Sequence, residues 1–469
     1  MIKNRLPYLL EINCFAYNIH KIVLNVNGDR LKSIILLFCF ITSFNFNSTY
    51  SQIFPEEPIV RVRIISTLDT LSLHFLNDWN LSQTNSHETI KIKKDDSLSI
   101  FIKNDSIIVN NLNVNVFYHY KSLSIKSDDA ANTLKIKNVP YGIGWWWAGI
   151  EDRIYEGEIE VSINEYKKFD VIIILPLEKY LCGVVPYEIG NDTPLEALKA
   201  QVIAARSETV DALISGKYRG NNFDLCADVE CQVFAGNNKR NLETDKAVEE
   251  TKGLCLFYKD QVIGAYYASN CGGMSENIEN VWPARSGSVP YWSSRFDSNE
   301  ELKYDPKNNP EDWIDCNPDV FCNPEFHPEL PEWSKKNFRW TVEMTNDELS
   351  NNLNEVKSIG EIQEIKIMER GNSGRIVKAR FIGSKDSLDL NSELEIRKIR
   401  KPPLRSSCFI FNKINSLDNS IVYNFKGAGW GHGVGMCQSG AVARAFSGQT
   451  YKQILNHYFP ETDIKSVFK

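Results

Sequence analysis

Apolar and polar residues alternate in short runs over the region that follows residue 52. The runs Val60–Ile65, Thr133–Lys137 and Glu156–Val161 each place an apolar residue at every second position or nearly so, with turn residues between the runs. Alternation of this kind indicates strands with one buried face. The pattern therefore predicts a β-rich region over residues 52–154.

A different pattern follows, with a fully apolar strand and then a helix. The run Val171–Leu175 has no polar position and predicts a buried strand. The run Thr193–Glu196 has the form of a capping box, with proline at the first helical position, and Gly216 is a candidate C-cap. One stripe of this predicted helix consists of Leu195, Leu198, Val202, Ala205 and Thr209.

Residues 286–335 are rich in proline, asparagine, aspartate and aromatic residues, and they predict an irregular insertion. Cys316 and Cys322 lie inside it, and their spacing suggests a local disulfide, with a metal site as the less favoured alternative because no histidine lies between them. Strand patterns return at Trp340–Met344 and Ile362–Met368. Two helices are expected near the end, over about Ser439–Ser447 and from a capping box that starts at Thr450.

These elements predict an α+β fold in which β-rich lobes surround a helical element, with a groove between them. We divide the chain into an N-terminal segment (1–51), a β-rich region (52–154), the first part of a core (155–285), the insertion (286–335) and the second part of the core (336–469). The length of 469 residues suits two or three units.

The N-terminal segment has the pattern of an export signal. Arg30 and Lys32 precede the apolar run Ile34–Ile41, and small residues such as Ser48 and Ser51 follow it. The run is shorter than the roughly 20 residues that span a bilayer. A cleaved signal peptide is the first expectation and an uncleaved anchor the second. Both predict that the rest of the chain is exported, to the periplasm or the cell surface.

Charge and cysteine content narrow the function further. The net charge is −7, and no basic stripe is present, which argues against a nucleic-acid partner. Nine of the eleven cysteines follow residue 51. In an oxidising compartment some of these should pair, and the odd number leaves at least one unpaired.

The stretch from Gly427 to Ala441 reads GAGWGHGVGMCQSGA, with glycine at every second position around His432. Glycine permits positive φ and close backbone approach. The spacing does not fit a dinucleotide-binding loop. His432 and Gln438, on either side of Cys437, are candidate functional residues, and a tight loop at a domain junction is the alternative.

Glu188 follows the apolar stretch that starts at Leu175. An apolar setting raises the pKa of a carboxyl group, whereas a nearby helix N-terminus lowers it. On residue chemistry alone, an ordinary surface carboxylate is the simpler interpretation.

Two further features stay open. Cys226 and Cys231, with Cys271 or His432 as further ligands, could bind zinc, while a disulfide is the simpler outcome in an exported chain. The triplet Trp145–Trp147 suits either a sugar-binding groove or a core plug.

Together these stretches resemble the stage II sporulation protein D family, which includes amidase enhancers. The resemblance rests on LPLEKYLCGVVPYE from Leu175, AQVIAAR from Ala200, CQVF from Cys231, SNCGG from Ser269 and the glycine-histidine motif, all in the family's order. It covers about residues 155–469 apart from the insertion.

The resemblance implies a lytic transglycosylase that cleaves peptidoglycan glycan strands, including peptide-free strands, with Glu188 as the acid/base residue. It implies substrate contacts from five residues: Arg206, Gln232, Ser269, His432 and Gln438. Many family members have serine where this chain has Cys437 and histidine where it has Ala268. These departures leave zinc open, and no other cofactor is expected.

The rival hypothesis is a glycan-binding module without catalysis that enhances a cell-wall amidase. A structural wall protein stabilised by zinc or disulfides is the third class.

Overall fold

The computed structural model describes residues 53–86, 88–114, 116–145, 147–284, 289–415 and 421–468. The predicted export segment 1–51 lies outside the described residues, and export remains a prediction. Within the described ranges, no helix combines the length and the apolar composition that crossing a membrane requires.

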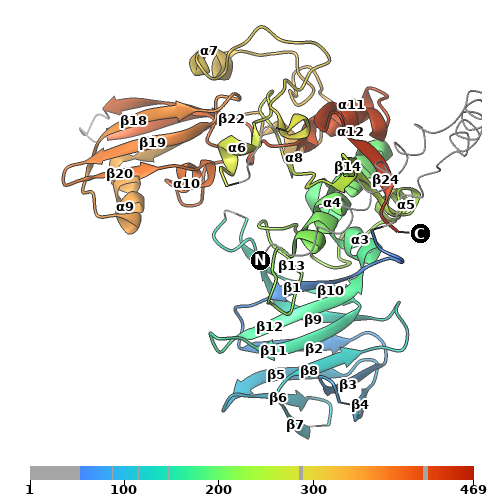
Figure 1. Cartoon of the computed structure of the whole chain (residues 1–469). Coiled ribbons are helices and arrows are strands. Elements are labelled where there is room, and N and C mark those ends of the chain that lie inside the picture. Colours follow the sequence, from blue (N-terminus) through green and yellow to red (C-terminus); the bar gives the residue numbers. More distant parts are fainter. Residues whose placement is uncertain are drawn as a thin grey trace, which may run out of the picture. The chain divides into compact units, whose positions relative to one another are not determined.

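Two large sheets make up the first part of the described chain, in the blue to green portion of the ribbon (Figure 1). The seven-stranded sheet has the order β13 (Leu225–Cys226), β1 (Ile59–Ile65), β12 (Phe169–Pro176), β11 (Glu158–Ile163), β8 (Leu123–Lys126), β3 (Trp79–Gln83), β4 (Thr89–Ile92). The six-stranded sheet has the order β10 (Gly149–Glu156), β9 (Thr133–Tyr141), β2 (Thr70–Phe75), β5 (Ser97–Lys103), β6 (Ser106–Asn111), β7 (Val116–Tyr120). The predicted strands at 60–65, 133–137 and 171–175 are all present.

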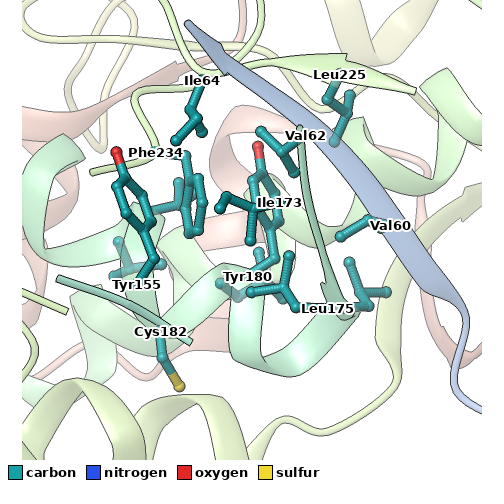
Figure 2. Packing of buried hydrophobic residues seen from close by; sticks show 14 of the residues in the cluster. Val60, Val62, Ile64, Tyr155, Ile173, Leu175, Tyr180, Cys182, Leu225 and Phe234 are labelled. Carbon is teal, nitrogen blue, oxygen red and sulfur yellow. The ribbon is translucent and has the colours of Figure 1, made fainter. Parts of the chain in front are cut away.

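One hydrophobic core contains residues from both sheets and from the first helix. Val62 of β1 and Leu73 of β2 both belong to it and are buried, as alternation of inward and outward residues requires. Tyr180 of α3 (Leu177–Glu188) packs on Phe234 with ring centroids 5.1 Å apart, beside Ile173 of β12 (Figure 2). These contacts hold α3 against the end of β12, the strand that directly precedes it in the chain.

The long helix α4 (Leu195–Ser215) ends at Gly216, which takes the left-handed conformation expected of a C-cap. The capping box predicted at its start is wrong. Pro194 is the N-cap residue, and the Thr193 hydroxyl donates to the carbonyl of Ile189 instead. The predicted capping box at Thr450 is confirmed in α12 (Tyr451–Tyr458).

Small helices and strands surround α4. They are α5 (Leu242–Glu250), α11 (Gln438–Phe446), and a sheet of β15 (Gln261–Val262), β14 (Leu254–Tyr258) and β24 (Asp463–Ser466). A two-stranded parallel sheet joins β16 (Tyr267–Ala268) to β23 (Met436–Cys437). These strands are far apart in sequence. Their pairing brings the glycine-histidine motif next to the SNCGG stretch.

The predicted insertion contains only short helices: η1 (Pro290–Trp292), α7 (Pro310–Asp315) and α8 (Glu332–Lys335). The disulfide predicted between Cys316 and Cys322 is not formed. The Cys316 thiol donates to the Trp313 carbonyl at 3.1 Å, whereas Cys322 lies against Cys271. The disulfide was expected because the two cysteines are close in sequence, but the fold gives each of them a different partner.

A second core lies between two three-stranded sheets and their helices. The elements are β17 (Arg339–Thr345), β22 (Ile421–Ala428), β21 (Phe409–Asn415), β18 (Ile362–Arg370), β19 (Ile376–Gly383), β20 (Ser387–Leu390), α9 (Asn346–Val356) and α10 (Glu393–Arg397). The short helix α6 (Ile278–Val281) packs in a separate cluster with Tyr266 and Val434. The α+β class is confirmed. The seven-stranded sheet also runs across the boundary expected at residue 154, because β11 and β12 pair with β8 and β1.

Candidate functional site

Glu188 is the last residue of α3 and is half-buried. Its Oε1 accepts a hydrogen bond from the Val233 backbone N–H at 2.8 Å. Burial raises the pKa of Glu188 to about 7, while the hydrogen bonds from Val233 and from the Gln438 side chain oppose that rise. The carboxyl lies at the negative C-terminal end of α3, which acts in the same direction as burial. Glu188 therefore has the pKa of a general acid that works near neutral pH.

Two buried amides lie beside this carboxyl. Gln438 opens α11 and donates from Nε2 to Oε1 of Gln201 on α4 at 3.3 Å. Both side chains are at most 3% exposed. The structure thus brings together Glu188 and Gln438, which the sequence analysis named separately, and adds Gln201 behind them.

A second carboxyl that the sequence analysis missed lies close by. Glu208, half-buried on α4, accepts from Nε2 of Gln232 at 3.4 Å. Burial first, and then the charge of Glu188, raise its pKa to about 8. The missed signal was the spacing of Gln201 and Glu208, seven positions apart, which puts two polar side chains on one face of a largely apolar helix.

Gln232 was predicted to contact substrate, but its side chain is 2% exposed. Its Oε1 accepts from the hydroxyls of Tyr180 and Thr209, each at 3.1 Å, and its Nε2 also donates to the Ala205 carbonyl at 3.0 Å. Gln232 therefore acts behind the site, where it orients Glu208 and anchors the segment that ends in Val233.

The structure also corrects the role expected for Arg206. Its guanidinium is fully buried and forms two hydrogen bonds with Glu178, at 2.9 and 2.5 Å, and a third with the Leu254 carbonyl at 3.0 Å. With its donors used inside the core, Arg206 joins α3 to α4 and β14 and presents no surface to a ligand.

The glycines of the C-terminal motif hold the chain against its own neighbours. Gly433 and Gly435 both have positive φ, and a Cβ at Gly435 would lie 2.1 Å from the Tyr266 carbonyl oxygen. The spacing therefore serves close backbone packing on the segment around β16.

His432, between these glycines, is half-buried and stacks at 4.9 Å on Trp282. Its Nδ1 accepts from the Val434 N–H at 3.0 Å. Burial, then the charges of Arg375 and Arg397, lower the pKa of His432 to about 3, so the ring is neutral and carries its proton on Nε2. Its partners include Val434, Tyr267 and Trp282.

Aromatic rings extend from this motif to the β-rich region. Trp147 contacts Trp430 edge-on, with centroids 5.7 Å apart, and stacks on Trp145 at 4.9 Å. All three rings are half-buried. Trp145 and Trp147 are therefore partly exposed and lie next to the motif, while Trp146 is outside the described residues.

Ser269 and the cysteines complete the set of predicted residues. The Ser269 hydroxyl accepts from Asn337 at 3.3 Å, and its carbonyl accepts the N–H and hydroxyl of Ser439. Ser269 thus supports the start of α11.

The expected zinc set is divided. The Sγ atoms of Cys226 and Cys231 are 3.1 Å apart, and Cys271 lies elsewhere, against Cys322 and Cys437. Hydrogen bonds from Cys226 and Tyr218 lower the pKa of Cys231 to about 6 against the effect of burial. Cys226, Cys231 and Cys271 therefore do not form one site, and the disulfide favoured for Cys226 and Cys231 is not formed in the structure.

Fold and site define an α+β protein with a carboxyl-centred site, built where two helices meet a glycine-rich loop. A profile described as "Stage II sporulation protein" matches residues 165–258, which contain Glu188 and Glu208, and a domain of unknown function (DUF8618) matches residues 276–435. The chain belongs to the stage II sporulation protein D family.

Three relatives illustrate the similarity. An uncharacterised protein of Brachyspira hyodysenteriae is 30% identical over 63% of this chain and 68% of its own length. The stage II sporulation protein D of Bacillus amyloliquefaciens is 27% identical over 67% of this chain and 81% of its own length. The amidase enhancer of Bacillus subtilis (strain 168) is 27% identical over 61% of this chain but only 40% of its own length.

Proposed function

We propose that the chain is an exported peptidoglycan lytic transglycosylase that cleaves glycan strands, including peptide-free strands, with Glu188 as its acid/base residue. Family membership supports a role at the cell wall. The observation that carries the proposal is the half-buried carboxyl of Glu188, whose pKa of about 7 leaves a large protonated fraction at neutral pH. An exposed glutamate would be almost fully ionised there.

The reaction requires one carboxyl group. The Glu188 acid gives its proton to the glycosidic oxygen as the bond from that oxygen to C1 breaks, with an oxocarbenium-like state at C1. The resulting carboxylate removes the proton of the muramyl C6 hydroxyl. The C6 oxygen attacks C1 and closes a 1,6-anhydro ring, and the proton returns Glu188 to its starting state.

Glu208 does not fit the role of a second catalytic carboxylate. A retaining glycosidase needs an ionised nucleophile close to its acid. The pKa of Glu208, raised to about 8 by burial and by Glu188, keeps this group mostly protonated at neutral pH. In this proposal Glu208 stays protonated and neutral beside Glu188, and only Glu188 changes its protonation state during the reaction.

The surrounding residues supply orientation and binding. Val233 and Gln438 hold the Glu188 carboxyl, which favours a fixed direction of proton transfer. The rings of Trp147 and Trp430 offer faces and edges on which sugar rings stack, since carbohydrates present apolar C–H surfaces.

Product analysis tests the proposal. Full-length protein is incubated with intact and amidase-treated peptidoglycan, beside Glu188→Gln and the matched surface variant Glu243→Gln in the exposed first turn of α5. Anhydromuramyl ends should appear with the wild type and Glu243→Gln and fall at least a hundredfold with Glu188→Gln, given the usual size of acid/base contributions. Equal release by Glu188→Gln would overturn the assignment.

The alternative function is enhancement of a cell-wall amidase, which the relative named amidase enhancer brings forward. It predicts that the chain binds glycan and releases no anhydromuramyl ends. Adding it to a purified amidase would then increase the release of peptides from the wall, and the Glu188→Gln variant would do so equally well.

A further inference from the structure

Three cysteines and one aspartate gather at a place that the proposed mechanism does not use. Cys271, Asp297, Cys322 and Cys437 come from four separate segments, and their ligand atoms all lie within 4.8 Å of one another. Each of the four residues is at most 4% exposed. Burial of four such groups together is unlike a surface cluster of acidic residues and requires an explanation.

The spacing suits tetrahedral zinc. The Sγ atoms of Cys271 and Cys322 are 3.6 Å apart. Zinc–sulfur bonds of about 2.3 Å in a tetrahedron place two sulfur atoms about 3.8 Å apart. A disulfide would require a separation of about 2.05 Å. The observed distance is too long for a disulfide and is compatible with two ligands of one ion.

Asp297 provides an independent sign of a missing partner. Its Oδ1 accepts from the Tyr458 hydroxyl at 2.7 Å and from Arg444 at 3.3 Å. Its Oδ2 is buried and has no hydrogen-bond partner. An unsatisfied buried carboxylate oxygen is costly, and a metal bond would satisfy it.

The groups around the cluster favour an ionised Cys437 and an ionised Asp297, and a glycine lets the chain pass close to the carboxylate. Cys437 is the N-cap residue of α11, and its Sγ accepts the N–H groups of Cys271 at 3.2 Å and Gly440 at 3.4 Å. Gly440 has no side chain, and a Cβ there would lie 2.1 Å from Oδ2 of Asp297. Arg444 adds a positive charge beside the carboxylate.

We propose that Cys271, Cys322, Cys437 and Asp297 bind one structural zinc ion through three sulfur atoms and Oδ2. Four protein ligands close the coordination shell, and burial leaves no position for substrate, so the ion stabilises the fold. It ties the loop segments that carry Asp297 and Cys322 to β23 and to the segment that follows β16. Since Cys437 directly precedes Gln438, the ion also fixes the start of α11 beside Glu188.

Cys226 and Cys231 lie in a different part of the fold from the proposed zinc ligands. They contact Tyr218, and the Lys217 ammonium lies 3.3 Å from Cys231. They lie outside the four-residue group. The double variant Cys226→Ser/Cys231→Ser is therefore a matched control, because it removes two close cysteines and leaves the proposed zinc ligands intact.

The test uses full-length protein purified in metal-free buffer with zinc as the probe. Elemental analysis should find about one zinc per chain, and X-ray absorption at the zinc edge should find three sulfur neighbours at about 2.3 Å and one oxygen at about 2.0–2.2 Å. Cys322→Ser and Asp297→Asn should lose zinc at least tenfold more readily to a chelator, while the double cysteine control should retain it.

Several results would overturn the proposal. They are wild-type protein that neither contains zinc nor takes it up, a Cys271–Cys322 disulfide found by peptide mapping, and a zinc shell with fewer than three sulfur atoms. Loss of zinc from the double control with retention in Cys322→Ser would do the same. If the ligand variants fail to fold, the absorption spectrum of the wild type still decides. None of these results depends on whether the chain cleaves glycan.

Discussion

The Val233 backbone N–H points at Oε1 of Glu188 over 2.8 Å and orients this carboxyl without a positive charge. A lysine or arginine in the same place would stabilise the carboxylate and lower its pKa. The neutral Val233 donor also lowers the pKa of Glu188, but burial outweighs it and the pKa stays at about 7. The predictions below test this arrangement and the contacts around it.

Replacing Gln438 should move the pH dependence of cleavage. The Gln438 hydrogen bond lowers the pKa of Glu188, so Gln438→Met should raise that pKa above about 7. Because the acid must be protonated, the alkaline limb of the rate profile should shift to higher pH, and the maximum rate should fall. Release of anhydromuramyl ends between pH 5 and 9 measures both effects. The exposed Gln261→Met is the control, and an unmoved limb for Gln438→Met would contradict the contact.

Glu208 should make the protein less stable as the pH rises. Its folded pKa of about 8 lies above the ordinary value of 4.5, so between these values the folded state binds more protons than the unfolded state. Stability from this group is full below pH 4.5 and is lost up to pH 8. Glu208→Gln removes this titrating group. As the pH rises, the free energy of unfolding of the variant should therefore increase relative to that of the wild type by up to about 1.4 kcal/mol per pH unit. Urea unfolding at pH 5, 6.5 and 8 measures the difference, and a constant difference would refute the burial effect.

Arg206 should matter for stability and not for binding. Arg206→Met leaves Glu178 buried without its partner, and breaking such a pair costs about 3–5 kcal/mol. The double variant Glu178→Gln/Arg206→Met should recover part of the loss. The exposed pair of Arg380 and Asp389 is the control, and Arg380→Met should cost far less. Glycan binding by the folded fraction of Arg206→Met should equal that of the wild type, and weaker binding would restore a substrate role.

Trp147 should contribute to glycan binding. Trp147→Ala removes a ring that contacts Trp430 and should weaken binding of soluble glycan strands about three- to tenfold, as expected for one aromatic contact. Tyr166→Ala removes a ring that is 75% exposed, in the turn between β11 and β12, and should leave affinity unchanged. Calorimetric titration of both variants compares them. Equal affinities for Trp147→Ala and the wild type would assign this ring to packing.

The sequence predicted the elements whose periodicity is local and failed where distant segments meet. The strand at 171–175 and the Gly216 cap depend on residues within a few positions, and both were found. Glu188 looked like an ordinary carboxylate until the family resemblance was considered, because its burial comes from the packing of segments far away in the chain. The helix start expected several residues after Glu188 is present in α4, but the sequence analysis missed α3, which contains Pro186 and ends at Glu188.

The cysteines show the same limit. Cys316 and Cys322 are close in sequence, yet Cys322 meets Cys271, 51 positions away, and Cys271 meets Cys437, 166 positions away. Arg206 belongs to a family motif, but only the structure places its guanidinium on Glu178 inside the core. A sequence motif identifies residues that belong together, but only the packed structure shows which of their side chains can reach a ligand.

The contact between Gln201 and Gln438 joins positions 237 residues apart. A chain that is still being synthesised, or that is threaded through a membrane with its C-terminus last, already contains Glu188 but has no Gln438 beside it. Long-range contacts of this kind form late in folding, because a large loop must close first. Incomplete chains, and chains shortened by proteolysis at the C-terminus, therefore lack Gln438 beside Glu188, and under the proposed function they should cleave glycan more slowly than the finished chain.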